Sequence, residues 1–257
     1  MRLLMSSFFR NCKFKPLYQS PKLRTFGSLS EDKSLTQSKV CGVVAADPSY
    51  VEVCPTWPVG EEPELRASVL RDMCVIPNFI TEQEEAVLLA ELEPVLKRMR
   101  YEFDHWDNAI QGYRETERSQ WRPENARVLE RVRTAAFDAP DAAHHRDTLP
   151  AAHVLDLAAQ GYIRPHVDAV RFCGPVIAGL CLLSDAVMRL EHSARPHLAV
   201  SALLERRCLY IMRGVARYDM THAVLGAEHS AWRGARVPRG RRLAVITRQR
   251  PLPQHTG

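Results

Sequence analysis

Residues 161–183 read GYIRPHVDAVRFCGPVIAGLCLL. Within them stands His166-Val167-Asp168. Residues i and i+2 of a β-strand share one face, so on a strand the imidazole and the carboxylate would lie about 7 Å apart. Such a pair can supply two ligands of a 2-His-1-carboxylate facial triad, a site that suits non-haem Fe(II). Taken alone, a short His-x-Asp is more often a solvated turn.

Short apolar or alternating segments around this stretch predict β-strands. They fall at residues 153–157, 161–163, 170–172, 177–183, 187–190, 208–212, 216–222 and 242–248. Many short strands separated by turns are typical of a double-sheet jelly roll or barrel. Upstream, Thr81-Glu82-Gln83-Glu84 is a capping box that begins an amphipathic helix, and residues 127–137 predict a second helix. We therefore expect an α+β fold, mainly β, with N-terminal helices flanking the β core.

A third metal ligand would be a histidine well downstream of Asp168. His192 and His197 stand in a polar stretch that predicts a loop, and His229 has polar neighbours as well. His222 ends an alternating segment that directly follows a buried-looking one. We therefore predict His222 as the third ligand.

Two other histidine groups are alternative metal candidates. His105-Trp106-Asp107 repeats the His-x-Asp pattern and could be completed by His153, although its aromatic surroundings favour a structural or substrate-facing segment. The adjacent His144 and His145 fall within residues 138–150, whose Pro and Asp content predicts a solvated loop.

The last predicted strand indicates an anion site. Arg242, Ala244, Ile246 and Arg248 share one face by the period of two, so both guanidiniums would point inward. A buried Arg is costly unless it is paired with an anion, and its planar fork suits a carboxylate. Tyr210, on a predicted inner strand, could donate its hydroxyl hydrogen to the same anion. A dicarboxylate that chelates iron at one end and meets Arg at the other, 2-oxoglutarate, would account for both features.

Composition sets limits on the partners. The chain has 257 residues, 46% hydrophobic and 25% charged, as in an ordinary globular domain with a full core. Its seven scattered cysteines form no C-x-x-C, so we expect free thiols and no zinc site. Without the six cations of residues 1–26, 29 Lys and Arg face 30 Asp and Glu, so the net charge of +5 is weak evidence for nucleic-acid binding. The basic run at residues 233–250, with seven Arg and no acid, would be a solvated face if no anion binds there.

The chain divides into four predicted parts. Residues 1–26 are basic, contain Ser and lack acids, which is typical of a mitochondrial transit peptide; the alternative is a disordered basic tail. Residues 27–64 show no sustained periodicity and predict a flexible linker. We place the folded domain at residues 65–250 and a short tail at 251–257. No run approaches the roughly 18 apolar residues of a membrane-spanning helix, so no membrane insertion is expected.

Three separated blocks carry a family resemblance. They are His166-Val167-Asp168, Gly214-Val215-Ala216-Arg217-Tyr218 leading to His222, and the Arg242 and Arg248 pair. Together they resemble the AlkB family of Fe(II)- and 2-oxoglutarate-dependent dioxygenases. Three further segments are similar to a mitochondrial member of that family, and the resemblance covers about residues 68–248: Tyr101-Glu102-Phe103-Asp104-His105-Trp106-Asp107, Arg114-Glu115-Thr116-Glu117 and Val237-Pro238-Arg239-Gly240-Arg241-Arg242.

The resemblance implies a cofactor set and a location. It places Fe(II) on His166, Asp168 and His222, and 2-oxoglutarate on Arg242 and Arg248 with Tyr210 as a further contact. It implies O2 as the second co-substrate, a double-stranded β-helix, and no metal at His105-Trp106-Asp107. It also implies a place in the mitochondrial matrix and roles in fatty-acid metabolism and in regulated necrosis after alkylation damage.

Departures from the family pattern bear on the substrate. Relatives that repair nucleic acids carry Arg-x-Asn-x-Thr-x-Arg in the last strand, where this chain has Ala244 and Ile246. No long insertion that could flip a nucleotide precedes His166, and a base in a duplex must be extruded before chemistry. The hairpin before Cys208 also lacks the Gly that relatives place there.

These departures rank the expected functions. We expect a monomer that hydroxylates a protein. Demethylation of unpaired methylated RNA is the second expectation, and a non-catalytic interaction module with a vestigial iron site is the third. Duplex DNA is not an expected substrate.

Overall fold

The computed structural model describes residues 45–103, 108–137 and 147–255. The predicted transit peptide, the metal candidate at residues 105–107 and the pair His144 and His145 lie outside the described residues. No helix among the residues that the structure describes has both the length and the apolar character needed to cross a bilayer.

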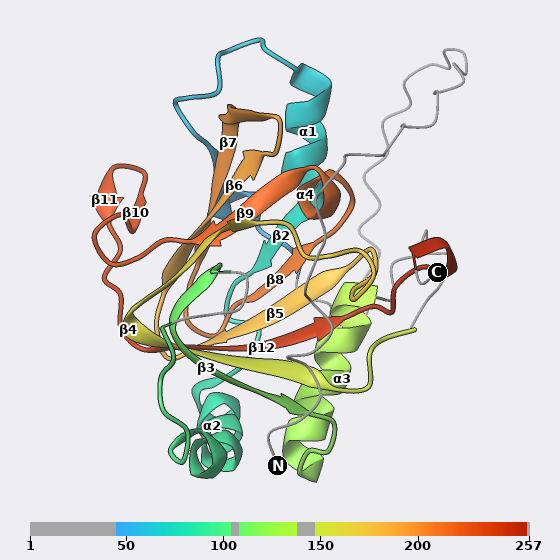
Figure 1. The fold of residues 1–257 in the computed structure, drawn as a ribbon, viewed down its shortest axis with the longest axis vertical. Helices are drawn as coiled ribbons and strands as arrows, with labels where there is room; N and C mark the ends of the chain where they lie inside the picture. The colour runs from blue at the N-terminus through green and yellow to red at the C-terminus, as the bar shows by residue number, and fades with distance from the viewer. Residues whose placement is uncertain (1–44, 104–107, 138–146, 256–257) are drawn as a thin grey trace, which may run out of the picture. The chain divides into compact units, whose positions relative to one another are not determined.

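The fold is an antiparallel sheet that curls into two layers, with helices against one of them (Figure 1). The strands of the main sheet are β1 (Val51–Val53), β2 (Met73–Ile76), β3 (Ile110–Arg118), β4 (Ala152–His166), β5 (Ile177–Leu182), β6 (Ala186–His192), β7 (Arg195–Leu204), β8 (Leu209–Met212), β9 (Met220–Val224) and β12 (Arg242–Arg248). A small hairpin holds β10 (Ala231–Trp232) and β11 (Ala235–Arg236). The helices are α1 (Pro63–Asp72), α2 (Glu82–Leu96), α3 (Pro123–Phe137) and α4 (Gly214–Tyr218), with 3-10 turns η1 (Pro48–Tyr50) and η2 (Pro253–His255).

The strand order identifies a jelly roll. The order is β1-β7-β6-β9-β4-β12-β5-β8-β2, with β3 added beside β4. The long β4 belongs to both layers, because its first half pairs with β12 and its last residues pair with β9. A strand that passes from one sheet to the other in this way makes the corner between two packed layers. The predicted mainly β fold with a jelly-roll core is confirmed.

Alternation along β12 separates the two hydrophobic cores. Ala244 and Ile246 lie in the core between the two layers, together with Tyr210, whereas Leu243 and Val245 face the core beneath the helices. The second core receives the buried faces of α2 and α3, which lie side by side against the β12 layer (Figure 1). The capping box at Thr81 forms as predicted, since its hydroxyl accepts from the Glu84 amide and the Glu84 carboxylate accepts from the Thr81 amide.

The structure differs from the predicted strands in several places. Residues 170–172 form a turn, in which the amides of Phe172 and Cys173 donate to the Ala169 carbonyl. Residues 216–222 divide between α4 and β9. Strands β3 and β7 were not predicted, because charged residues occupy much of the first and polar residues open the second, and neither were β1 and the short β10 and β11. The hairpin before β8 forms without Gly, because Arg207 itself adopts the left-handed conformation with a φ of 71°.

The expected flexible linker is wrong from residue 45 onward. β1 pairs with β7, and the Asp47 amide donates to the Val75 carbonyl of β2, so this segment joins the two ends of the sheet. Trp57 is 3% exposed within the interior core, and its indole donates to the Glu61 carbonyl. The segment has few apolar residues, and they stand at irregular intervals. Its sequence therefore has no periodicity that would predict a strand or a helix.

Trp57→Ala tests whether residues 45–64 belong to the folded domain. The substitution empties a buried site in the interior core, so we expect the free energy of unfolding to fall by about 3–5 kcal/mol. Urea unfolding of the purified chain measures it. Val59→Ala is the control, because Val59 is 97% exposed and its loss should change stability by less than about 0.5 kcal/mol. Equal stability of the two variants would show that residues 45–64 are a linker and not part of the folded domain.

Candidate active site

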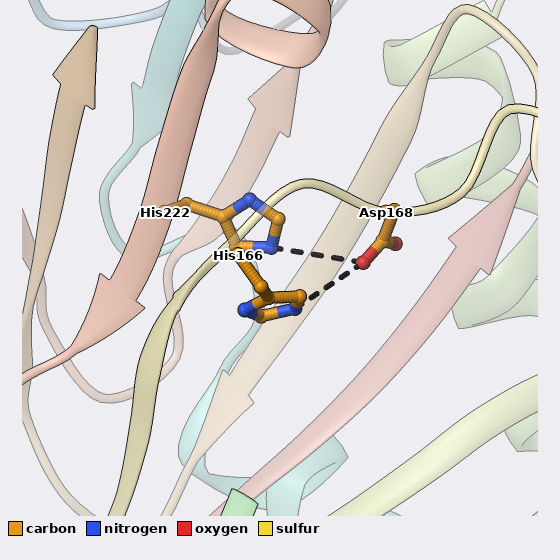
Figure 2. Close-up of side chains that lie close together, drawn as sticks. All are labelled: His166, Asp168 and His222. Carbon is orange, nitrogen blue, oxygen red and sulfur yellow. Dashed lines mark ion pairs between the residues drawn. The ribbon is translucent and has the colours of Figure 1, made fainter. Parts of the chain in front are cut away.

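Three side chains from separate segments converge on one point (Figure 2). His166 is the last residue of β4, His222 lies opposite it in β9, and Asp168 follows on the loop after β4. The His166 Nε2 atom lies 3.4 Å from the Asp168 Oδ1 atom, and the His222 Nε2 atom lies 3.8 Å from the same oxygen. The candidate ligand atoms all lie within 4.8 Å of one another.

The pair His166 and Asp168 meets for a different reason than the sequence indicated. The prediction placed both on one strand, but β4 ends at His166 and Asp168 belongs to the following loop. His222 stands in the middle of β9 and not at its end, in register with His166. The two imidazole rings therefore face each other across the strand pair, with centroids 4.3 Å apart.

The protonation states suit a divalent metal. The His166 Nδ1–H donates to the Arg164 carbonyl at 2.9 Å, which leaves a lone pair on the Nε2 atom that faces Asp168. Burial lowers the pKa of His222 to about 3, so this ring is neutral near pH 7. Burial acts to raise the pKa of Asp168, but the Arg248 guanidinium holds it well below its usual range. Two imidazoles and a carboxylate facing one another form the donor set of a facial triad.

Two guanidiniums border this centre and differ in their partners. Arg248 donates from Nε to the Asp168 Oδ2 atom at 3.2 Å. Arg242 is 2% exposed, and its Nη2 donates to the Cys181 thiol at 3.2 Å while its Nε has no partner. No carboxylate of the described residues lies within 4.0 Å of Arg242. The solvated-face alternative is therefore wrong for Arg242, which is a buried cation with a free Nε donor and a sulfur partner, Cys181, whose pKa is lowered to about 6 by hydrogen bonds from Cys208 and Arg242.

Tyr210 completes the wall beside Arg242. It is 5% exposed in β8, and burial raises its pKa, so the phenol remains protonated and can donate. Its ring lies over Gly179 of β5, where a Cβ would stand only 2.2 Å from a ring carbon. Sequence reasoning missed Gly179, because a glycine within a strand has no local signal for what packs on it.

The other histidine candidates have local roles. The His192 Nδ1 atom accepts from the amides of Ala194 and Arg195 in the hairpin between β6 and β7, and His197 pairs with Glu61 at 3.0 Å. The His153 Nε2 atom faces Glu115 at 2.9 Å. In the described part of the chain, the cluster of His166, Asp168 and His222 is the one group arranged to hold a metal.

Sequence reasoning also missed two residues next to the cluster. Cys173 donates its thiol hydrogen to the Asp168 Oδ2 atom at 3.7 Å, and burial beside Asp168 raises its pKa to about 11. Arg217, 1% exposed, donates to the Cys173 sulfur at 2.9 Å. Arg217 belongs to residues 214–218, one of the blocks that carry the family resemblance, but only the structure shows its contacts.

Comparison with known proteins identifies the family. The chain is 52% identical over 183 residues to "Alpha-ketoglutarate-dependent dioxygenase alkB homolog 7, mitochondrial" of Mus musculus, which covers 71% of this chain and 80% of the mouse protein. The chain belongs to the AlkB-homologue family of alpha-ketoglutarate-dependent dioxygenases. A Bos taurus protein of the same name is 50% identical over 185 residues, or 72% of this chain and 81% of its own length. The predicted resemblance is confirmed, although no family model matches the chain.

Two solved structures are also similar to this AlkB-family chain. That of OsALKBH1 has a TM-score of 0.49 at 16% identity, covering 69% of this chain and 96% of its own. That of a Pseudomonas putida prolyl-4-hydroxylase has a TM-score of 0.43 at 15% identity, covering 72% and 99%.

His222 should give the metal-free protein a characteristic pH dependence. An unfolded His titrates near pH 6.5, whereas folded His222 stays neutral down to about pH 3, so stability falls as the pH falls through this window. The pKa of Asp168 is lowered as well, but its contribution to stability is lost only below about pH 3.9, outside this window. We expect wild type to lose about 2 kcal/mol more than His222→Gln between pH 7 and pH 5. Urea unfolding in EDTA measures this difference, and equal losses would show that His222 titrates normally.

Proposed function

We propose that this chain is a mitochondrial Fe(II)- and 2-oxoglutarate-dependent dioxygenase with its metal on His166, Asp168 and His222. The observation that carries the proposal is the convergence of two imidazole nitrogens and a carboxylate oxygen beside Arg242, which is buried and has no carboxylate partner among the described residues. When bound, Fe(II), 2-oxoglutarate and O2 supply oxidation of a substrate C–H bond with release of succinate and CO2. The chain supplies the ligands, the orientation of the co-substrate and a wall that excludes water.

The two arginines have separate roles in this proposal. Arg248 already donates to Asp168, so it would orient the carboxylate that holds the metal. Arg242 has a thiol as its partner and an unpartnered Nε, so it binds the far carboxylate of 2-oxoglutarate. Tyr210 donates its hydroxyl hydrogen toward the same carboxylate.

The substrate we favour is a protein side chain. The interior positions between the two arginines are Ala244 and Ile246, which offer no polar group to a nucleobase. Demethylation of unpaired RNA is the second candidate, and a non-catalytic interaction module is the third. The transit-like N-terminus and the mitochondrial naming of both relatives support a place in the mitochondrion, and we propose the matrix. Roles in fatty-acid metabolism and regulated necrosis stay predictions of the family resemblance.

His222→Ala should abolish iron-dependent turnover. Removing one of three ligands leaves a site with too few donors for Fe(II), so succinate formation from 2-oxoglutarate with Fe(II) and ascorbate should fall to background. His229→Ala is the matched control, since this exposed histidine lies outside the cluster. Wild-type turnover by His222→Ala would contradict the assignment of His222 as a metal ligand.

The same incubations separate the candidate substrates when matrix protein or RNA extracts are added. A gain of one oxygen atom in a protein, dependent on Asp168, supports hydroxylation. Formaldehyde release from methylated RNA supports demethylation. Partner binding that survives loss of His166 and Asp168, with no succinate from any extract, supports the interaction module.

Substitution of the two arginines should give different binding defects. Arg242→Met leaves the far carboxylate of 2-oxoglutarate without its cation, so its Kd should rise at least about 30-fold while the metal Kd stays nearly unchanged. Arg248→Met frees Asp168 and should weaken metal binding about 10-fold or more. Calorimetric titration of Mn(II), and of 2-oxoglutarate in the presence of Mn(II), measures both. The reverse pattern would exchange the two roles.

A further inference from the structure

The position of Asp168 requires support from outside its own segment. His166 and His222 are held by strand pairing, but Asp168 stands on the irregular stretch of residues 167–176 between β4 and β5. Near its far end this stretch is tied to the strand layer where the Gly174 amide donates to the Gln249 carbonyl at 2.9 Å. A ligand on a loop needs further contacts if its carboxylate is to face both imidazoles in the absence of metal.

Arg217 supplies such contacts from the opposite side of the loop. Its Nε donates to the Gly174 carbonyl at 3.3 Å, and its Nη2 donates to the Cys173 carbonyl at 3.2 Å and to the Cys173 sulfur at 2.9 Å. The Cys173 thiol in turn donates to the Asp168 Oδ2 atom. The planar guanidinium therefore spans two consecutive residues of the loop and reaches the ligand carboxylate through one sulfur atom.

The burial of Arg217 makes this arrangement costly. The side chain is 1% exposed, and no carboxylate of the described residues lies within 4.0 Å of it. Its Nη1 atom is buried without a partner. An apolar side chain of similar size would avoid this desolvation cost, so the contribution of the guanidinium lies in its directed hydrogen bonds to the loop.

The backbone of Arg217 is fixed with respect to His222. Arg217 lies on α4, whose first turn is held by Asp72, because the Val215 amide donates to the Asp72 carboxylate at 2.9 Å. Gly214 permits the close approach, since its φ is 49° and a Cβ there would lie 2.3 Å from an Asp72 oxygen. α4 then leads directly into β9, which carries His222.

We propose that Arg217 is a positioning residue that holds the loop carrying Asp168 in register with His222. One side chain thereby couples the segments of two metal ligands, although it touches neither metal nor co-substrate. This inference rests on the proposed metal site at His166, Asp168 and His222.

Binding of Co(II) to the purified full chain without O2 tests the proposal with a readout independent of turnover. The Kd and the visible absorption spectrum of bound Co(II) report the affinity and the ligand geometry. For Arg217→Met we expect a Kd raised about 10- to 100-fold and an altered spectrum. Arg217→Lys keeps the charge and one of the donors, so it should recover part of the affinity. Arg213→Met is the control, because Arg213 precedes α4 and its guanidinium points to Cys74.

The outcomes separate this inference from the proposed function. If wild type binds no Co(II), or if Asp168→Ala binds it equally well, the metal site itself is wrong. If Asp168→Ala loses binding while folded Arg217→Met keeps the wild-type Kd and spectrum, only the role of Arg217 is wrong. Should Arg217→Met fail to fold, Arg217→Lys decides: weakened binding at an unchanged melting temperature supports the proposal, and wild-type binding overturns it.

Discussion

The carboxylate of Asp168 is the point on which the centre of this molecule depends. Its Oδ1 atom faces the imidazoles of His166 and His222, and its Oδ2 atom receives hydrogen bonds from Arg248 and Cys173. A partly buried carboxylate remains ionised only where cations and donors surround it, and here they come from β12 and from its own loop. The jelly roll therefore brings four separate segments to one anion, and this is the preorganisation that a metal site requires.

A second buried carboxylate explains the sequence similarity outside the centre. Asp156 of β4 is fully buried and receives hydrogen bonds from Arg114, Arg241 and Tyr101. These three partners come from the three segments that resemble a mitochondrial member of the family. Their meeting at one carboxylate ties β3 and β12 to β4 and indicates a structural role for those segments. Loss of one partner from such a network leaves a buried charge uncompensated, which is strongly destabilising.

A third network fixes the helical side of the fold. Glu85 of α2 is 1% exposed and accepts from the Arg206 guanidinium and from the Leu183 amide. Arg207, in its left-handed conformation, pairs with Glu82 and approaches Glu85. The hairpin that lacks glycine is thus held by ion pairs to the helix beneath it, which offset the cost of about 1–2 kcal/mol of this backbone conformation.

The sequence by itself determined what depends on local periodicity and chemistry. The period of two along β12 correctly separated the interior positions Ala244 and Ile246 from Leu243 and Val245, and the capping box at Thr81 located the start of α2. The donor chemistry of His166, Asp168 and His222 indicated a metal before any geometry was known.

Only the tertiary structure decided the features that depend on contacts between distant segments. Asp168 lies on a loop, residues 47–53 join the two ends of the sheet, and Arg217 reaches Cys173 from 44 positions further along the chain. The different partners of Arg242 and Arg248, which are Cys181 and Asp168 respectively, likewise depend on contacts between distant segments. Such pairings leave no periodic trace in the sequence, because burial and partner choice are set by the packing of the two sheets.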